Sequence, residues 1–128
     1  MSQRQAIQNR LINDVSTVDG RVFVSRAPPM VESPYIVITK VTGGRRFDMM
    51  GPVGIDRSTW QISIFAQQET SNSPESIAEE ILQEVRASLD TWRNADVGST
   101  VEDNQVNDWE DDTGFFHIAI DYSIGFHE

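Results

Sequence analysis

The chain has 128 residues and a formal net charge of −10, from 10 Lys and Arg against 20 Asp and Glu, and it contains no cysteine. This length suits one domain, and the lack of cysteine excludes a disulfide framework, a thiolate metal site and a cysteine nucleophile. No stretch approaches the roughly 20 consecutive apolar residues of a membrane span, so we expect a soluble protein made in the cytoplasm with no membrane partner. An acidic protein repels phosphate backbones, which argues against a general nucleic-acid binder.

Acidic and basic residues are unevenly distributed along the chain. Residues 1–57 carry eight basic and five acidic residues, whereas residues 58–128 carry two basic and fifteen acidic residues. If this separation persists after folding, each copy has a basic face and an acidic face, which suits head-to-tail association. The alternative is chance segregation, in which both signs mix on the folded surface.

The first third of the chain predicts a helix and two strands. An apolar residue at every fourth position from Ile7 to Val15 predicts a helix over about 2–15. A short strand is expected at 21–25, and residues 35–42 are β-branched or aromatic almost throughout. That composition predicts a central strand with both faces largely covered.

Residues 43–57 interrupt this regular pattern. They mix charges with glycine, proline and large apolar residues, and we expect a protruding hairpin arm or a long loop within a single domain that spans 1–128. Large apolar side chains in such a segment stay wet unless another polypeptide covers them, so a partner explains them better than a core. The residues assigned to this candidate interface, with one tryptophan from farther along the chain, are Arg45, Arg46, Phe47, Met49, Met50, Arg57 and Trp109.

A strand and a long helix follow the interrupted segment. Over residues 58–66, large apolar residues alternate with mostly polar ones, which predicts a half-buried strand. The serine, proline and glutamate at 73–75 are residue types that favour a helix start. Apolar residues then recur every four positions from Ile77, so we expect a helix over about 74–93 with Arg86 facing water.

The chain ends in two expected strands, 101–109 and 115–126, joined by an acidic turn at 110–114. Apolar residues occupy every second position of the last strand, which predicts one buried and one outward face. The fold class is therefore α+β, with a mainly antiparallel sheet packed by one long helix (about 74–93) and a shorter N-terminal helix (about 2–15).

The three tryptophans differ in the positions expected for them. Trp60 and Trp92 fit the apolar pattern of their elements, so we expect both in the core. Trp109 lies beside the acidic turn, and because tryptophan is enriched at binding hot spots, a core and an interface position remain equally open for it.

No arrangement of residues nominates a catalytic or metal site. His117 and His127 are ten residues apart without metal-ligand spacing, and solvated positions are expected for both. The chain has no nucleophile elbow, no glycine-rich dinucleotide motif and no phosphate-binding loop. The acidic stretch near the C-terminus also lacks the glycine of a calcium loop. We therefore expect no enzymatic activity and no cofactor.

The same acidic stretch is a second candidate contact surface. Charge runs are usually solvated, so the simplest interpretation is a hairpin exposed to water. An acidic patch also complements a basic one on a neighbouring molecule. The residues assigned to this surface are Glu102, Asp103, Asp108, Glu110, Asp111 and Asp112.

The order of several motifs resembles the tail completion, or tail terminator, family of long-tailed phages. The matching motifs are a strand ending at Ala27-Pro28-Pro29, then Pro34-Tyr35-Ile36-Val37 leading to Gly43-Gly44, a Gly-Pro-x-Gly stretch at 51–54, and a strand of the type Gln-Ile-Ser-Ile-Phe-Ala at 61–66. A long helix ending near a tryptophan and a Thr-Gly turn at 113–114 complete the pattern. The resemblance covers nearly the whole chain, and the acidity of residues 102–112 departs from it.

The resemblance implies a structural virion protein without catalytic residues. It also implies a hexameric ring that caps the tail tube and joins it to the head connector, with the DNA only passing through the channel. The implied partners are further copies of the chain, the tail tube protein and the head–tail connector protein, and the implied location is the virion tail, assembled in the host cytoplasm. The acidic stretch then faces either a neighbour or the lumen, where like charge lets DNA slide. The alternative function is a small acidic binding module that mimics DNA.

Overall fold

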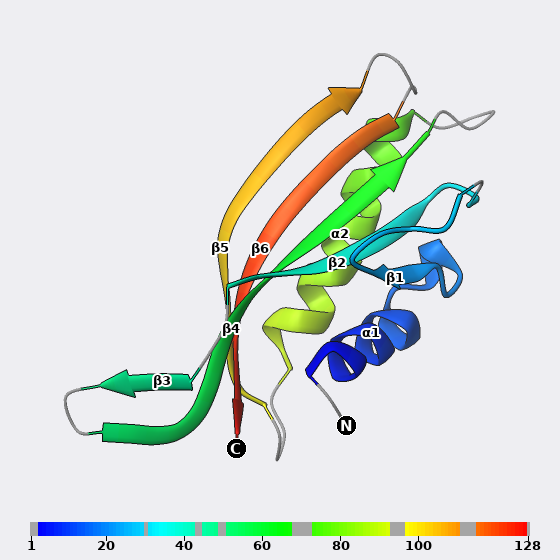
Figure 1. Cartoon of the computed structure of the whole chain (residues 1–128). Helices are drawn as coiled ribbons and strands as arrows, with labels where there is room; N and C mark the ends of the chain where they lie inside the picture. Colours follow the sequence, from blue (N-terminus) through cyan, green and yellow to red (C-terminus); the bar gives the residue numbers. More distant parts are fainter. Residues whose placement is uncertain are drawn as a thin grey trace.

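A computed structural model describes residues 3–29, 31–42, 45–48, 51–67, 73–92, 97–110 and 115–127 of the chain. Each of the two helices is followed in the chain by a group of strands, as expected from the sequence, and the α+β fold class is confirmed (Figure 1). The elements in chain order are α1 (Gln3–Asp14), a short 3-10 turn (Ser16–Val18), β1 (Val22–Val24), β2 (Tyr35–Thr42), β3 (Arg45–Asp48), β4 (Gly51–Ala66), α2 (Pro74–Asp90), β5 (Val97–Glu110) and β6 (Phe115–His127).

The strands form one six-stranded sheet with the order β1-β2-β4-β6-β5, and β3 pairs with β4 beside this path. β1 and β2 are parallel, whereas every other pair is antiparallel, which gives the mainly antiparallel sheet that the sequence predicted. Figure 1 places β5 at one edge of the sheet and β1, with α1 beside it, at the other edge. The two edges of the protomer are therefore different in length and in neighbouring structure.

The core lies between one face of the sheet and the two helices. α2 contributes a stripe with four-residue spacing, and both β4 and β6 contribute every second residue, as the sequence pattern predicted. Trp60 and Trp92 are each 4 % exposed, which confirms both as core residues. The buried residues of these three elements include Ile77, Ile81, Val85, Leu89, Trp60, Ile62, Ile64, Ile118, Ile120, Tyr122 and Ile124.

The ends of two elements differ from the sequence prediction. α2 ends at Asp90, because Trp92 turns back and its ring packs edge-on against Phe126 in the core, at 5.9 Å between ring centroids. β5 begins at Val97 rather than at residue 101. Its register shifts twice against β6, between Val97 and Ser99 and between Glu102 and Asn104, and these irregularities break the alternation that marks a strand in a sequence.

β2 is covered less completely than expected. Ile36 and Ile38 are fully buried against the helices and Val37 is 7 % exposed on the other face, but Val41 is 51 % exposed. The expectation of two largely covered faces is therefore wrong for the end of this strand. The physical reason is that both helices lie on one face of the sheet, so β-branched composition marks strand formation here rather than burial.

Candidate assembly surfaces

The interrupted segment of the sequence forms a β-hairpin at one end of the sheet. β3 pairs with the start of β4, and the register places Arg45 opposite Asp56, and Asp48 opposite Gly51. Figure 1 shows this hairpin extending away from the helices. We call Arg45–Asp48 and 51–57 the arm.

The arm is continuous with the core through a single strand. β4 is 16 residues long, and it pairs with β6 only from Ile55 onward. The residues of β4 before Ile55 therefore pair with β3 alone. This places Arg45, Arg46 and Phe47 on β3 and Arg57 at the base of the arm, while Met49 and Met50 lie outside the described residues.

β5 provides a second surface of a different kind. It is 14 residues long and pairs with β6 on one side, and its other side has no partner strand among the described elements. Three apolar side chains on it are exposed, namely Val101 at 50 %, Val106 at 53 % and Trp109 at 46 %. The exposure of Trp109 excludes the core alternative for this residue. A long unpaired edge is a template for pairing with another chain, so β5 is a candidate contact surface.

Most of the acidic residues singled out in the sequence lie along this edge strand. Glu102, Asp103, Asp108 and Glu110 belong to β5, whereas Asp111 and Asp112 lie outside the described residues. Asp103 falls at the register shift after Glu102, and both Asp103 and Asp108 are exposed. The acids are thus distributed along an extended strand rather than gathered in one turn.

Glu102 differs from Asp108 because it is bonded to another element, whereas Asp108 accepts a hydrogen bond from the backbone N–H of its neighbour Trp109, at 2.9 Å. Arg86 on α2 donates from Nε to Glu102 Oε1 at 2.9 Å and from Nη2 to Glu102 Oε2 at 3.0 Å, and Nη2 also donates to Gln105 at 2.7 Å. The hydrogen-bonded carboxylate of Glu102 raises the pKa of Arg86. Arg86 therefore faces water only in part, because the edge strand covers the rest of its side chain.

A second polar contact joins α2 to the sheet close by. Tyr122 is fully buried on β6, and its hydroxyl donates to Asp90 Oδ1 at 3.0 Å. Burial raises the pKa of Tyr122, and the hydrogen bond to Asp90 and the charge of that carboxylate raise it further. This contact holds the last turn of α2 against the sheet.

The face of the sheet opposite the helices carries a row of rings that the sequence did not reveal. Tyr35 stacks on Phe65 at 5.0 Å between centroids, and Phe65 stacks on His117 at 4.4 Å with an angle of 7° between planes. Phe115 packs edge-on against both Tyr35 and Phe65. The row follows from the register, which places Tyr35 opposite Phe65 and Phe65 opposite His117. The expectation of a solvated His117 is wrong because this ring is half-buried in the stack.

The described residues show no arrangement suited to metal chemistry. Among them there is no group of three or more histidine or carboxylate side chains placed to hold a metal ion. His127 lies at the end of β6, opposite Ile55 of β4. In the same part of the chain no helix is both long and apolar enough to cross a bilayer.

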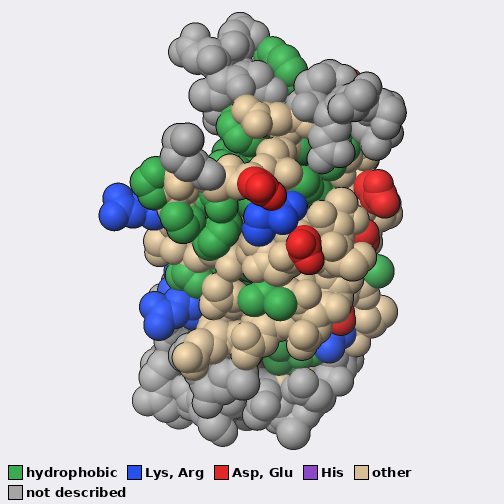
Figure 2. Space-filling view, turned by 90° about the vertical axis from the view of Figure 1, so that its right-hand side faces the viewer, with side chains coloured by type: hydrophobic (Ala, Val, Ile, Leu, Met, Phe, Trp, Pro, Cys, Tyr) green, Lys and Arg blue, Asp and Glu red, His purple; other side chains and the backbone are tan. Residues whose placement is uncertain are grey.

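Figure 2 views the side that carries α1 and β1. Basic side chains lie at one border of this view, but others lie next to acidic side chains in its middle and towards the opposite border. A projecting arm and an edge strand without a partner among the described elements are features that suit contacts with other polypeptides. The described elements thus form a small α+β fold with two candidate contact surfaces.

Comparison with known proteins gives the family. The model of the tail completion protein gp17 family matches residues 5–127, so the chain belongs to this family of structural phage-tail proteins. A chain from a solved structure described as "Virion of native gene transfer agent (GTA) particle" is similar in fold, with a TM-score of 0.72 and 12 % sequence identity over 99 % of this chain and 96 % of that chain. No curated protein sequence matches the chain significantly.

Proposed function

We propose that the chain is the subunit of a hexameric ring that closes the head-proximal end of a tail tube and joins it to the head connector. Membership of the tail completion family supports a structural role at this end of the tail. The similar fold of a chain from a phage-like particle agrees with assembly in a virion. The proposed neighbours are the tail tube protein, the connector protein and further copies of the chain.

The observation that carries this proposal is the presence of two unlike surfaces on one protomer. The arm extends from one end of the sheet, and β5 forms an unpaired edge 14 residues long. A closed ring requires a heterologous interface, in which one patch meets a different patch on the next copy. A protomer with two different extended surfaces satisfies this requirement.

The arm is the first proposed ring contact. It contains Phe47, and Met49 and Met50 stand between its two strands in the sequence; such apolar residues are suited to a protein interface. In this proposal Arg45, Arg46 and Arg57 supply the basic component of the contact. The exposed acids of β5 face either a neighbouring copy or the lumen, where they prevent DNA from adhering.

Electron microscopy of the purified protein tests the ring. We expect closed rings with a central hole, and a strictly monomeric protein at all concentrations would overturn the proposal. Phe47→Asp tests the arm, because it places a charge where the proposal requires an apolar contact. We expect this variant to fold with a wild-type circular dichroism spectrum but to remain monomeric, and normal rings from it would remove the arm from the interface.

A further inference from the structure

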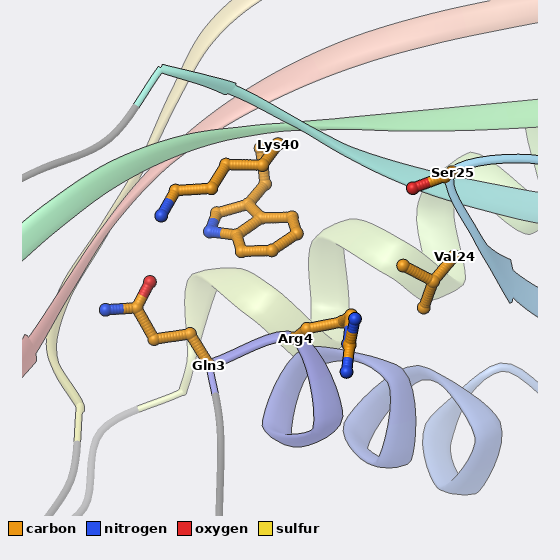
Figure 3. Close-up of a pocket in the computed structure, with 6 residues that line it drawn as sticks. Gln3, Arg4, Val24, Ser25 and Lys40 are labelled. Atoms are coloured by element: carbon orange, nitrogen blue, oxygen red, sulfur yellow. The ribbon is translucent and has the colours of Figure 1, made fainter.

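A pocket of about 380 Å³ opens between α1 and the sheet, at the side of the molecule away from β5. Figure 3 shows Lys40 reaching into it from β2, Gln3 and Arg4 from the start of α1, and Val24 and Ser25 from the end of β1. Trp60 of β4 is the sixth lining residue. We call this the donor pocket, because its polar groups are mainly hydrogen-bond donors.

The donor pocket holds two cations and no carboxylate among its lining residues. Within the described part of the chain, neither Arg4 nor Lys40 takes part in an ion pair, whereas Arg10, Arg21 and Arg86 each have a carboxylate partner. The Lys40 ammonium lies over the Trp60 ring, 5.9 Å from its centroid. The positive charge of the pocket is therefore not neutralised by the described residues of its own molecule.

The indole N–H of Trp60 is a second feature of the donor pocket that calls for an acceptor. The Trp60 side chain is 4 % exposed, and its indole Nε1 is buried without a hydrogen-bond partner among the described residues. Buried donors in folded proteins almost always have an acceptor, because leaving one unsatisfied is unfavourable. An acceptor supplied from outside this chain's described residues fits that requirement.

The start of α1 also favours a negatively charged group in the donor pocket. α1 has 12 residues and begins at Gln3, and its first turn contains no acidic residue. The backbone N–H groups and the dipole at a helix start favour a negative charge nearby. Arg4, Lys40, the unbonded indole N–H and the helix start each favour an anion here, and the pocket is large enough to admit a carboxylate side chain.

We propose that the donor pocket receives an aspartate carboxylate from β5 of a second copy of this chain. The inference rests on the proposed ring. β5 and β1 lie at opposite edges of the sheet, and the donor pocket lies on the side of β1. The β5 edge of one copy can therefore contact the pocket of the next copy, and repeating this contact in one direction closes a ring. Asp103 and Asp108 are exposed on β5, whereas Glu102 is already bonded to Arg86.

Charge complementarity selects this occupant over an unrelated partner. The chain has a net charge of −10, and fifteen of its twenty acidic residues lie after residue 57. A cationic pocket on a protein of this charge attracts the acidic edge of another copy. This attraction also fixes the orientation of the second copy relative to the first. Salt then weakens assembly, because it screens the attraction between these groups.

The first experiment removes the cations. Sedimentation velocity over a concentration series compares the full-length wild type with a variant that combines Arg4→Gln and Lys40→Gln. Arg26→Gln is the matched control, because it removes an exposed cation in the loop after β1. We expect the double variant to need at least about tenfold more protein for half-maximal ring formation, and the control to match the wild type. An equal midpoint for the double variant and the wild type overturns the donor pocket while leaving the ring intact.

The second experiment exchanges the charges across the contact. Asp103→Lys combined with Asp108→Lys, in an otherwise wild-type chain, is expected to lose assembly, and adding Lys40→Glu is expected to recover part of it. A lack of recovery in folded protein overturns the pairing of β5 with the pocket. A wild type that is monomeric under all conditions refutes the ring itself, and the inference that rests on it.

Discussion

Arg86 on α2 and Glu102 on β5 form a bidentate ion pair, with both nitrogen–oxygen distances at or below 3.0 Å. This pair joins the long helix to the outermost strand of the sheet. Among the described strands β5 has a hydrogen-bonded neighbour on one side only, so a side-chain contact to α2 gives it a second attachment. Glu102 therefore belongs to the structure of the protomer, whereas Asp103 and Asp108 remain exposed for contact with other molecules.

Glu102→Gln is expected to lower the free energy of unfolding of the monomer by up to about 1 kcal/mol. The lost interaction is a partly exposed ion pair, for which stabilisation of this size is typical. Urea denaturation followed by circular dichroism measures the change. Asp108→Asn is the matched control on the same strand, and it should leave the denaturation midpoint unchanged. A larger effect at Asp108 than at Glu102 would contradict the roles assigned to the two acids.

Tyr122 makes the stability of the protein sensitive to alkaline pH. Its pKa is higher in the folded state than the value of about 10 in an unfolded chain. The corresponding stabilisation is fully present below pH about 10 and is lost as the pH rises towards the higher pKa of the folded state. We expect the urea midpoint to fall above pH about 10.

Two variants separate this effect from general alkaline unfolding. Tyr122→Phe should begin about 1 kcal/mol less stable, because it loses the hydrogen bond to Asp90. Its stability should then change less with alkaline pH. Ile118→Val, a change of a non-titrating buried side chain on the same strand, should keep the wild-type pH dependence. An unchanged pH profile in Tyr122→Phe would show that another group controls the transition.

Ile120→Ala tests the packing between the sheet and the helices. Ile120 is fully buried on β6, and removing a side chain of this size from a packed core costs about 2–5 kcal/mol. Val106→Ala is the matched control on β5, where the side chain is 53 % exposed and the expected change is within about 0.5 kcal/mol. Similar losses at both positions in chemical denaturation would contradict the assignment of the core to the helix-covered face.

Trp109→Ser tests the edge strand as an interface. Trp109 is 46 % exposed in the isolated chain, so its loss should leave the monomer folded with little change in stability. Exposed tryptophans that become buried on association often contribute about 2 kcal/mol or more to binding. Assembly measured by light scattering should therefore require at least about tenfold more protein. Unimpaired rings in this variant would place Trp109 outside the interface.

The sequence predicts the parts of the fold that repeat with a regular period. The spacing from Ile77 to Leu89 and the alternation along 58–66 and 115–126 each depend on one element and one buried face. Family motifs then agree with the arrangement of these elements. The position of Trp60 follows directly, because it continues the alternation of its own strand, whereas Trp92 is buried beyond the end of α2.

The surfaces depend on relationships between elements, and these are harder to predict. The stacking of His117 on Phe65 requires the register between β4 and β6. The bonding of Arg86 to Glu102 requires β5 to lie beside α2, and the register shifts of β5 conceal where that strand begins. The donor pocket brings together residues of α1, β1, β2 and β4, which no local sequence pattern indicates.

The uninterrupted course of β4 has a mechanical consequence. The strand that forms half of the arm continues without a break into the centre of the sheet, where it pairs with β6 from Ile55 to Ala66. A force applied to β4 within the arm therefore acts directly on the pairing of the same strand with β6, without an intervening loop.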